Sequence, residues 1–244
     1  MLAIDIKELT KVFAERTAVD HLNLQIREGE IFALLGANGA GKTTTIRMLC
    51  GLIPPTSGDG VLAGKSIVLE PELAKKKINV SPQETAVAPL LTVQENLEMI
   101  ARIYGMDRKK AKIQAKEMME KFQLSDRARE NAKKLSGGYQ RRLSIAMALI
   151  TQPEILFLDE PTLGLDVRAR RNLWKLIQEL KGNMTIVLTT HYLEEAEALA
   201  DRIGIMNQGR LEIIGTVEQI EEQTGEKSLE EAFLELTEED QCEA

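Results

Sequence analysis

The sequence predicts an α/β fold: a mostly parallel sheet core, an antiparallel β subdomain and an inserted helical lobe. A short apolar run at 31–35 leads through a glycine-rich turn into a stretch that has no helix breaker. Two further runs, 155–158 and 185–190, are short and mostly apolar, as buried parallel strands are. Residues 92–134, between the runs 31–35 and 155–158, have helical patterning.

The composition is that of an ordinary globular protein, and residues 1–244 are expected to form a single domain. The chain has 244 residues, with 43% hydrophobic and 28% charged residues. A net charge of -7 argues against a nucleic-acid-coating surface, so no nucleic acid is expected as a partner. The two cysteines suit a reducing compartment and show no metal-binding spacing.

The first 30 residues have the alternation of a half-buried sheet. Leu22, Leu24 and Ile26 repeat with period two, which favours antiparallel strands with one buried face. Phe13 falls between two such regions. Its ring could stack on a base or belong to the core of the sheet, and the periodicity alone favours the core.

The next segment has the spacing of a phosphate-binding loop, GxxxxGK[ST], between a strand and a helix. Its residues are Gly36, Ala37, Asn38, Gly39, Ala40, Gly41, Lys42, Thr43 and Thr44. Glycines let backbone N–H groups turn toward an anion, and the helix that begins near Lys42 adds its positive end. Lys42 can reach the β- and γ-phosphates, and the Thr43 hydroxyl can bind Mg²⁺. The alternative, a tight turn with an incidental lysine, fits this context poorly. We therefore predict a nucleoside triphosphate site in a core of the P-loop NTPase type.

The helical lobe is expected to span about residues 92–150. Thr92 and Glu95 have the spacing of a capping box, and Asp107 is placed to cap a second helix. Ser136 is placed to cap a third helix, and the glycines after it leave backbone N–H groups open to an anion. Gln83, in a loop before the lobe, is either a surface residue or a ligand of Mg²⁺ or water.

Three polar side chains follow two of the apolar strands. In a doubly wound sheet, chemistry collects at the carboxyl ends of strands. Asp159 is placed there to hold Mg²⁺, and Glu160 to orient and deprotonate a water molecule. The alternative is a pair of solvated carboxylates. His191 ends the next strand, where a contact with the γ-phosphate is favoured over a structural role.

The C-terminal part is expected to be an acidic helical tail over about 216–244. Leu229, Phe233 and Leu236 have helical spacing, so the tail should pack one face and solvate the other. No secretion signal is recognisable at the N-terminus, and no apolar run approaches the roughly 20 residues of a membrane-spanning helix.

With these segments placed, the chain resembles the ATPase subunit of an ATP-binding cassette (ABC) transporter over essentially its whole length. The motifs that carry the resemblance are GANGAGKTT at 36–44, LSGGYQ at 135–140, ILFLDEPT at 155–162 and His191 at a strand end. A phosphate loop alone would leave kinases and GTPases open. The signature LSGGYQ shortly before LDEPT excludes kinases and GTPases.

The resemblance implies ATP and Mg²⁺ as ligands and assigns further roles. Phe13 matches the aromatic residue that stacks on adenine, a place usually taken by Tyr. Gln83 resembles the glutamine that senses Mg²⁺ and contacts the transmembrane partner. Ser136, Gly137 and Gly138 match the signature that binds the γ-phosphate of ATP held by the opposite subunit, and Asp166 resembles the aspartate that faces the partner's phosphate loop.

The resemblance also implies an assembly. Two ATPase chains, identical or close paralogues, would dimerise head to tail and drive a transmembrane permease subunit from the cytoplasmic face of the cell membrane, as peripheral subunits. Residues 189–197 and 228–237 resemble the branch that drives drug, polysaccharide or lipid exporters. An alternative is a soluble ABC ATPase of translation or repair, which usually carries a second cassette or a long coiled-coil insertion. A regulatory module without hydrolysis would be expected to lack Glu160 or His191.

Overall fold

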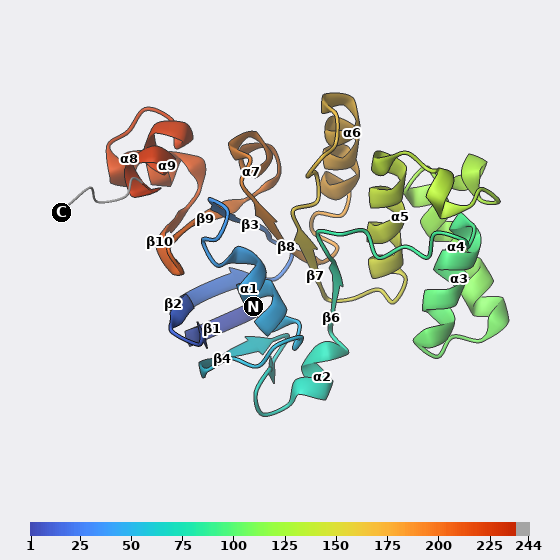
Figure 1. Ribbon diagram of the computed structural model, residues 1–244, viewed down its shortest axis with the longest axis horizontal. Coiled ribbons are helices and arrows are strands. Elements are labelled where there is room, and N and C mark those ends of the chain that lie inside the picture. The colour runs from blue at the N-terminus through green and yellow to red at the C-terminus, as the bar shows by residue number, and fades with distance from the viewer. Residues whose placement is uncertain (238–244) are drawn as a thin grey trace.

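The computed structural model describes residues 1–237, and it contains the predicted mixture of parallel and antiparallel strands (Figure 1). A six-stranded sheet has the order β10-β9-β3-β8-β7-β6. All its neighbouring strands are parallel except β10, which runs antiparallel to β9. Its strands are Ile31–Gly36 (β3), Ile78–Ser81 (β6), Ile155–Asp159 (β7), Thr185–Thr190 (β8), Arg202–Asn207 (β9) and Arg210–Gly215 (β10). The predicted fold class is confirmed.

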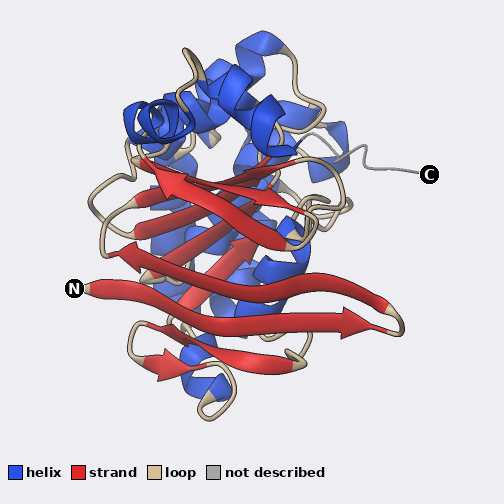
Figure 2. Cartoon of the chain, turned by 90° about the vertical axis from the view of Figure 1, so that its left-hand side faces the viewer, coloured by secondary structure: helices blue, strands red, loops and turns tan. Residues whose placement is uncertain are grey.

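A second, antiparallel sheet has the order β2-β1-β4-β5. Its strands are Leu2–Phe13 (β1), Arg16–Arg27 (β2), Ser57–Leu62 (β4) and Lys65–Ser66 (β5). Leu22, Leu24 and Ile26 are buried while their neighbours are exposed, as the alternation predicts. Figure 2 shows this sheet below the parallel one, with most helices gathered on the far side of the parallel sheet.

Nine α-helices connect or flank the strands in the described part of the chain. They are Lys42–Leu49 (α1), Pro71–Lys75 (α2), Val93–Ile103 (α3), Arg108–Lys121 (α4), Gly137–Leu149 (α5), Val167–Gln178 (α6), Leu193–Leu199 (α7), Val217–Thr224 (α8) and Leu229–Thr237 (α9). Helices α3, α4 and α5 lie together at one end of the molecule (Figure 1). The capping box of Thr92 and Glu95 and the Asp107 cap are both present.

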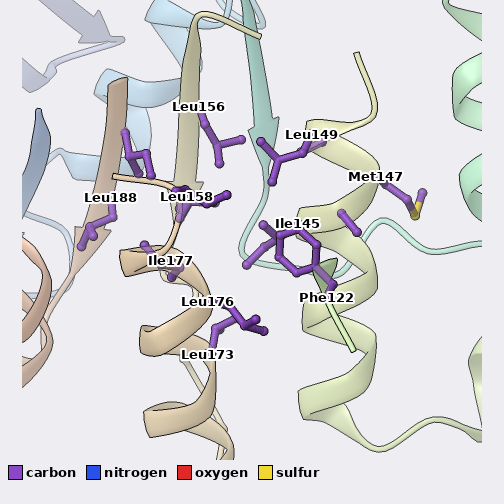
Figure 3. Packing of buried hydrophobic residues seen from close by; sticks show 14 of the residues in the cluster. Phe122, Ile145, Met147, Leu149, Leu156, Leu158, Leu173, Leu176, Ile177 and Leu188 are labelled. Atoms are coloured by element: carbon purple, nitrogen blue, oxygen red, sulfur yellow. The ribbon is translucent and has the colours of Figure 1, made fainter. Parts of the chain in front are cut away.

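The core has two parts because each central strand contributes to both faces of the parallel sheet. In β3, Ile31, Ala33 and Leu35 pack on the helical side, whereas Phe32 and Leu34 pack toward the antiparallel sheet. On the helical side, Figure 3 shows Ile145 and Leu149 of α5, Leu156 and Leu158 of β7, and Leu173, Leu176 and Ile177 of α6. Burial on both faces explains why β3 is apolar throughout.

The C-terminal helices pack against the edge of the parallel sheet. Leu229 is buried, and Asn207 Nδ2 at the end of β9 donates a hydrogen bond of 3.3 Å to the Leu236 carbonyl of α9. The tail predicted over 216–244 is therefore helical as far as the described residues reach. Its last part, 238–244, lies outside them.

Candidate functional site

The carboxyl ends of three neighbouring strands form one edge of the parallel sheet. Leu35 of β3 pairs with Thr190 of β8, and Asp159 of β7 pairs with Thr189. Because the strands are parallel and in this register, the segments that follow them begin side by side. The phosphate loop, Glu160 and His191 are the residues that follow.

The phosphate loop bends closely over its neighbours, and its glycines make this possible. Gly41 has φ 107° and precedes α1, and a Cβ added to it would lie 2.5 Å from the Ala18 carbonyl oxygen. A Cβ on Gly36 would meet the Met206 carbonyl oxygen at the same distance, 2.5 Å. The helix α1 begins at Lys42, as predicted, so its first N–H groups open toward the loop.

Lys42 is a buried cation, with only 6% of its surface exposed. Its Nζ donates hydrogen bonds to the carbonyls of Gly36 at 2.6 Å and Ala37 at 3.0 Å, and lies 3.6 Å from Glu160 Oε1. Burial lowers the pKa of Lys42, while Glu160 and Asp159 act in the opposite direction. The carboxylates therefore favour the charged ammonium that phosphate binding requires.

Asp159 is held by hydroxyl groups from two other elements. It accepts hydrogen bonds on Oδ1 from Thr43 Oγ1 at 3.0 Å and from Thr189 Oγ1 at 2.6 Å. Gln83 lines the same cavity as Thr43. These candidate ligands offer oxygen only, which Mg²⁺ prefers, and one or two protein ligands with substrate phosphates are its usual arrangement. The donor set therefore fits Mg²⁺.

Glu160 and His191 form a pair. His191 Nδ1 lies 2.7 Å from Glu160 Oε2, and the Glu160 side chain is almost completely buried. The Glu160 backbone has φ 49°, a conformation that costs a residue with a Cβ about 1–3 kcal/mol and that clusters at active sites. Its N–H donates to the Thr189 carbonyl at 3.1 Å and to Thr189 Oγ1 at 3.0 Å, which holds it in this conformation.

A cavity of about 670 Å³ connects these groups. Phosphate-loop residues line it together with Phe13, Gln83, Glu160 and His191. Phe13 is 47% exposed at the end of β1. The core position that its periodicity favoured is therefore wrong, because the β1–β2 hairpin extends beyond the sheet's buried face.

The signature lies elsewhere. None of Ser136, Gly137, Gly138 and Asp166 lines this cavity. Ser136 occupies the N-cap position of α5, as predicted, but its side chain makes no cap hydrogen bond, so the capping role is wrong. Asp166 caps α6 by accepting a hydrogen bond of 2.9 Å from the Ala169 N–H. The starts of α5 and α6 are neighbours, since a Cβ on Gly138 would lie 3.1 Å from Ala169 Cβ.

Two residues at the site were missed by the sequence reasoning. Thr189 bonds both Asp159 and Glu160, and a polar residue near the end of a buried strand was the signal that could have found it. Arg141 donates hydrogen bonds to the carbonyls of Pro82 and Gln83. Nothing in the sequence distinguishes it from an exposed helix arginine.

Within residues 1–237, no helix combines the length and the apolar character that crossing a bilayer requires.

Comparison with known proteins assigns the family. The profile of the family described as ABC transporter matches residues 19–163. The chain is 42% identical over 211 residues to the linearmycin resistance ATP-binding protein LnrL of Bacillus subtilis (strain 168), covering 86% of this chain and 68% of LnrL. It is 45% identical over 217 residues to human phospholipid-transporting ATPase ABCA3, covering 87% of this chain but 13% of that relative.

A solved structure has the same fold. It is a dimeric post-hydrolysis state of the ATP-binding cassette MJ0796 bound to ADP and Pi, with a TM-score of 0.78 and 28% identity over 87% of this chain and 98% of that one. The matched family profile includes the phosphate loop, the signature and the Asp159–Glu160 pair. The chain therefore belongs to the ABC transporter family and is one of its ATPases.

Proposed function

We propose that this chain is the ATP-hydrolysing motor subunit of an ABC transporter, which dimerises head to tail around two ATP molecules and powers export through a separate membrane subunit. The observation that carries the proposal is the separation within one chain. The phosphate loop, Glu160 and His191 share one cavity, and the signature at Ser136 lies outside it. We also propose that residues 1–244 form one ATPase domain with a helical lobe at about 92–150.

ATP binding is assigned to the phosphate loop and Phe13. The loop's backbone N–H groups and Lys42 would hold the phosphates, and the exposed Phe13 ring would stack on adenine. Thr43, Asp159 and Gln83 would hold Mg²⁺, which would neutralise the negative charge that develops on the phosphates.

Hydrolysis is assigned to Glu160 and His191. Glu160 would orient a water molecule and accept its proton as the water oxygen bonds to the γ-phosphorus and the bond to the ADP oxygen breaks. His191 would hold Glu160 through their 2.7 Å contact and donate to the γ-phosphate. The buried, hydrogen-bonded position of Glu160 suits a group that must keep one orientation.

A second ATPase chain would complete each site. Its Ser136, Gly137 and Gly138 would bind the γ-phosphate, and its Asp166 would face the phosphate loop. The dimeric MJ0796 structure, whose fold this chain shares, supports this arrangement. So does the exposed Ser136, whose hydroxyl caps no helix N–H, unlike the side chains of Thr92 and Asp107.

Export and the membrane partner are proposed from the relatives and from one surface. LnrL is named for drug resistance and ABCA3 for phospholipid transport. Leu90, shortly before α3, and Ile103, the last residue of α3, are 70% and 69% exposed. We place the contact with a transmembrane permease here and at Gln83, which would put the ATPase on the cytoplasmic face of the membrane as a peripheral subunit.

Cysteine crosslinking in native membranes tests the partner assignment. In a variant without the two native cysteines, Leu90→Cys and Ile103→Cys should crosslink to a membrane protein that copurifies with the chain. Leu234→Cys on α9, 53% exposed, is the matched control and should not. Crosslinks from Leu234→Cys alone would show that the docking surface is wrong. A chain that copurifies with no membrane protein would favour a soluble ABC ATPase acting in another process.

A further inference from the structure

Arg141 joins the signature helix to the loop that carries Gln83. It lies on the first turns of α5, and only 4% of its surface is exposed. Its Nη1 donates a hydrogen bond of 2.6 Å to the Pro82 carbonyl, and its Nη2 donates to the Gln83 carbonyl. One guanidinium therefore holds two consecutive peptide units of this loop.

A buried arginine usually pairs with a carboxylate, because an isolated buried charge is costly. In the described part of the chain, no carboxylate forms an ion pair with Arg141. Asp159 and Glu195 attract it only from a distance, and burial lowers its pKa. A methionine of similar length would fill the same space without this cost. Stability alone therefore does not explain an arginine at position 141.

The neighbouring contacts show what the arginine connects. Ser144, one turn further along α5, lies 3.0 Å from Ser81 through their hydroxyls, so α5 is tied to both the end of β6 and the loop after it. Arg142 faces a different element: its Nη1 donates to Gln123 Oε1 at 3.2 Å, and its guanidinium lies over the Tyr139 ring. Of the two consecutive arginines, only Arg141 bonds the backbone at Gln83.

We propose that Arg141 is a positioning residue that couples Gln83 to the signature, by fixing the backbone of 82–83 relative to the start of α5. This proposal rests on the proposed function, in which Gln83 contacts Mg²⁺ or the catalytic water and Ser136 contacts the ATP of the opposite subunit. The rigid two-carbonyl attachment means that a displacement of the Gln83 loop displaces Gly137 and Gly138, and the reverse. Arg141 itself does not line the cavity that Gln83 and Glu160 share.

A double-mutant cycle on ATP hydrolysis tests the coupling. Arg141→Met should lower kcat by about 10- to 100-fold, the effect of a small misplacement of a reacting group, and leave KM for ATP unchanged. If Arg141 acts through Gln83, then Arg141→Met added to Gln83→Ala should cost nothing further. Arg141→Lys, which keeps the charge but not the fork, should restore part of kcat.

Matched variants separate this proposal from a purely structural role. The fold-loss of kcat caused by Arg142→Met should multiply with the fold-loss caused by Gln83→Ala, because Arg142 does not bond the loop. If the cost of Arg141→Met also multiplies, or if it acts on KM, the coupling is absent. If both Arg141→Met and Arg141→Lys lose their cooperative thermal unfolding transition, Arg141 serves folding and the proposal is overturned.

Failure of the proposed function is recognised separately. A Glu160→Gln variant that hydrolyses ATP at the unmutated rate would overturn the catalytic assignment. In that case the double-mutant cycle on Arg141 and Gln83 would no longer measure a coupling to the proposed catalytic groups. An inactive Glu160→Gln variant together with multiplying effects of Arg141 and Gln83 would overturn the coupling alone.

Discussion

The phosphate-loop edge and the start of α5 both expose a helix N-terminus, but they differ in what surrounds that terminus within the chain. At α1, the buried Lys42, the Glu160 carboxylate and His191 share one cavity. At α5, Ser136 makes no cap bond, and neither it nor the two glycines after it line that cavity.

This difference separates the region expected to carry out hydrolysis from the region expected to control assembly. The groups that hold and cleave a phosphate come from strands β3, β7 and β8, whose register fixes them relative to one another. The signature sits on the helical lobe, which meets the sheet through α5 and through contacts such as Arg141. We expect substitutions at the phosphate-loop edge to act on ATP binding and hydrolysis within a chain. Substitutions at the start of α5 should act on assembly.

The largest effect is expected at Glu160. Glu160→Gln keeps the size of the side chain but cannot accept a proton, and the loss of a general base costs about 10²–10⁴ in rate. ATP should still bind, because Lys42, Thr43 and Asp159 are unchanged. Asp159→Asn should differ by weakening Mg²⁺-dependent ATP binding itself. Steady-state hydrolysis and equilibrium binding measure both, and an unimpaired Glu160→Gln rate would contradict the base assignment.

A smaller effect is expected at Phe13. Stacking of an aromatic side chain on a base is worth about 1–3 kcal/mol, so Phe13→Ala should weaken ATP binding by about 5- to 150-fold. Phe13→Tyr should bind normally, since the tyrosine ring also stacks. Isothermal titration with ATP measures this. Equal affinities of Phe13→Ala and the unmutated chain would remove Phe13 from the site.

The smallest effect is expected in the lobe. Thr92→Ala should cost about 1 kcal/mol of unfolding free energy by removing a cap, while the ATP affinity of the phosphate loop stays unchanged. Urea unfolding measures the cost. Loss of ATP affinity in this variant would show that the two regions are not independent.

Repeating the unfolding of Thr92→Ala at low pH tests the role of Glu95 in this cap. The backbone N–H of Thr92 is the chief cause of the lowered pKa of Glu95, followed by the Thr92 hydroxyl. A lowered pKa contributes stability that is present above the ordinary value of 4.5 and is lost as the pH falls through the lowered value. The cost of Thr92→Ala should therefore shrink in acid. In the capping box of Thr216, the partner Gln219 does not titrate. The Thr216 hydroxyl is nevertheless the chief cause of the lowered pKa of Glu218, so the cost of Thr216→Ala should also shrink in acid.

The sequence was sufficient for the fold and for most of the strand-end residues, because their types and positions are local properties. The phosphate loop follows an apolar run, and Asp159 and Glu160 end another, so parallel strands bring them to one edge. Thr189, Arg141 and the position of Phe13 were not predictable in the same way. Each depends on a contact or an exposure that only the packing of distant segments creates.

Gel filtration in the Glu160→Gln background tests the central claim, that the signature completes the ATP site of a second chain. With ATP and Mg²⁺, the Glu160→Gln protein should elute as a dimer, because hydrolysis no longer separates the chains. Adding Ser136→Arg should return it to the monomer while the monomer's ATP affinity stays unchanged, and Ser125→Arg, an exposed serine elsewhere on the lobe, should leave the dimer intact. A dimer that survives Ser136→Arg, or a large loss of ATP affinity in the monomer, would contradict the account.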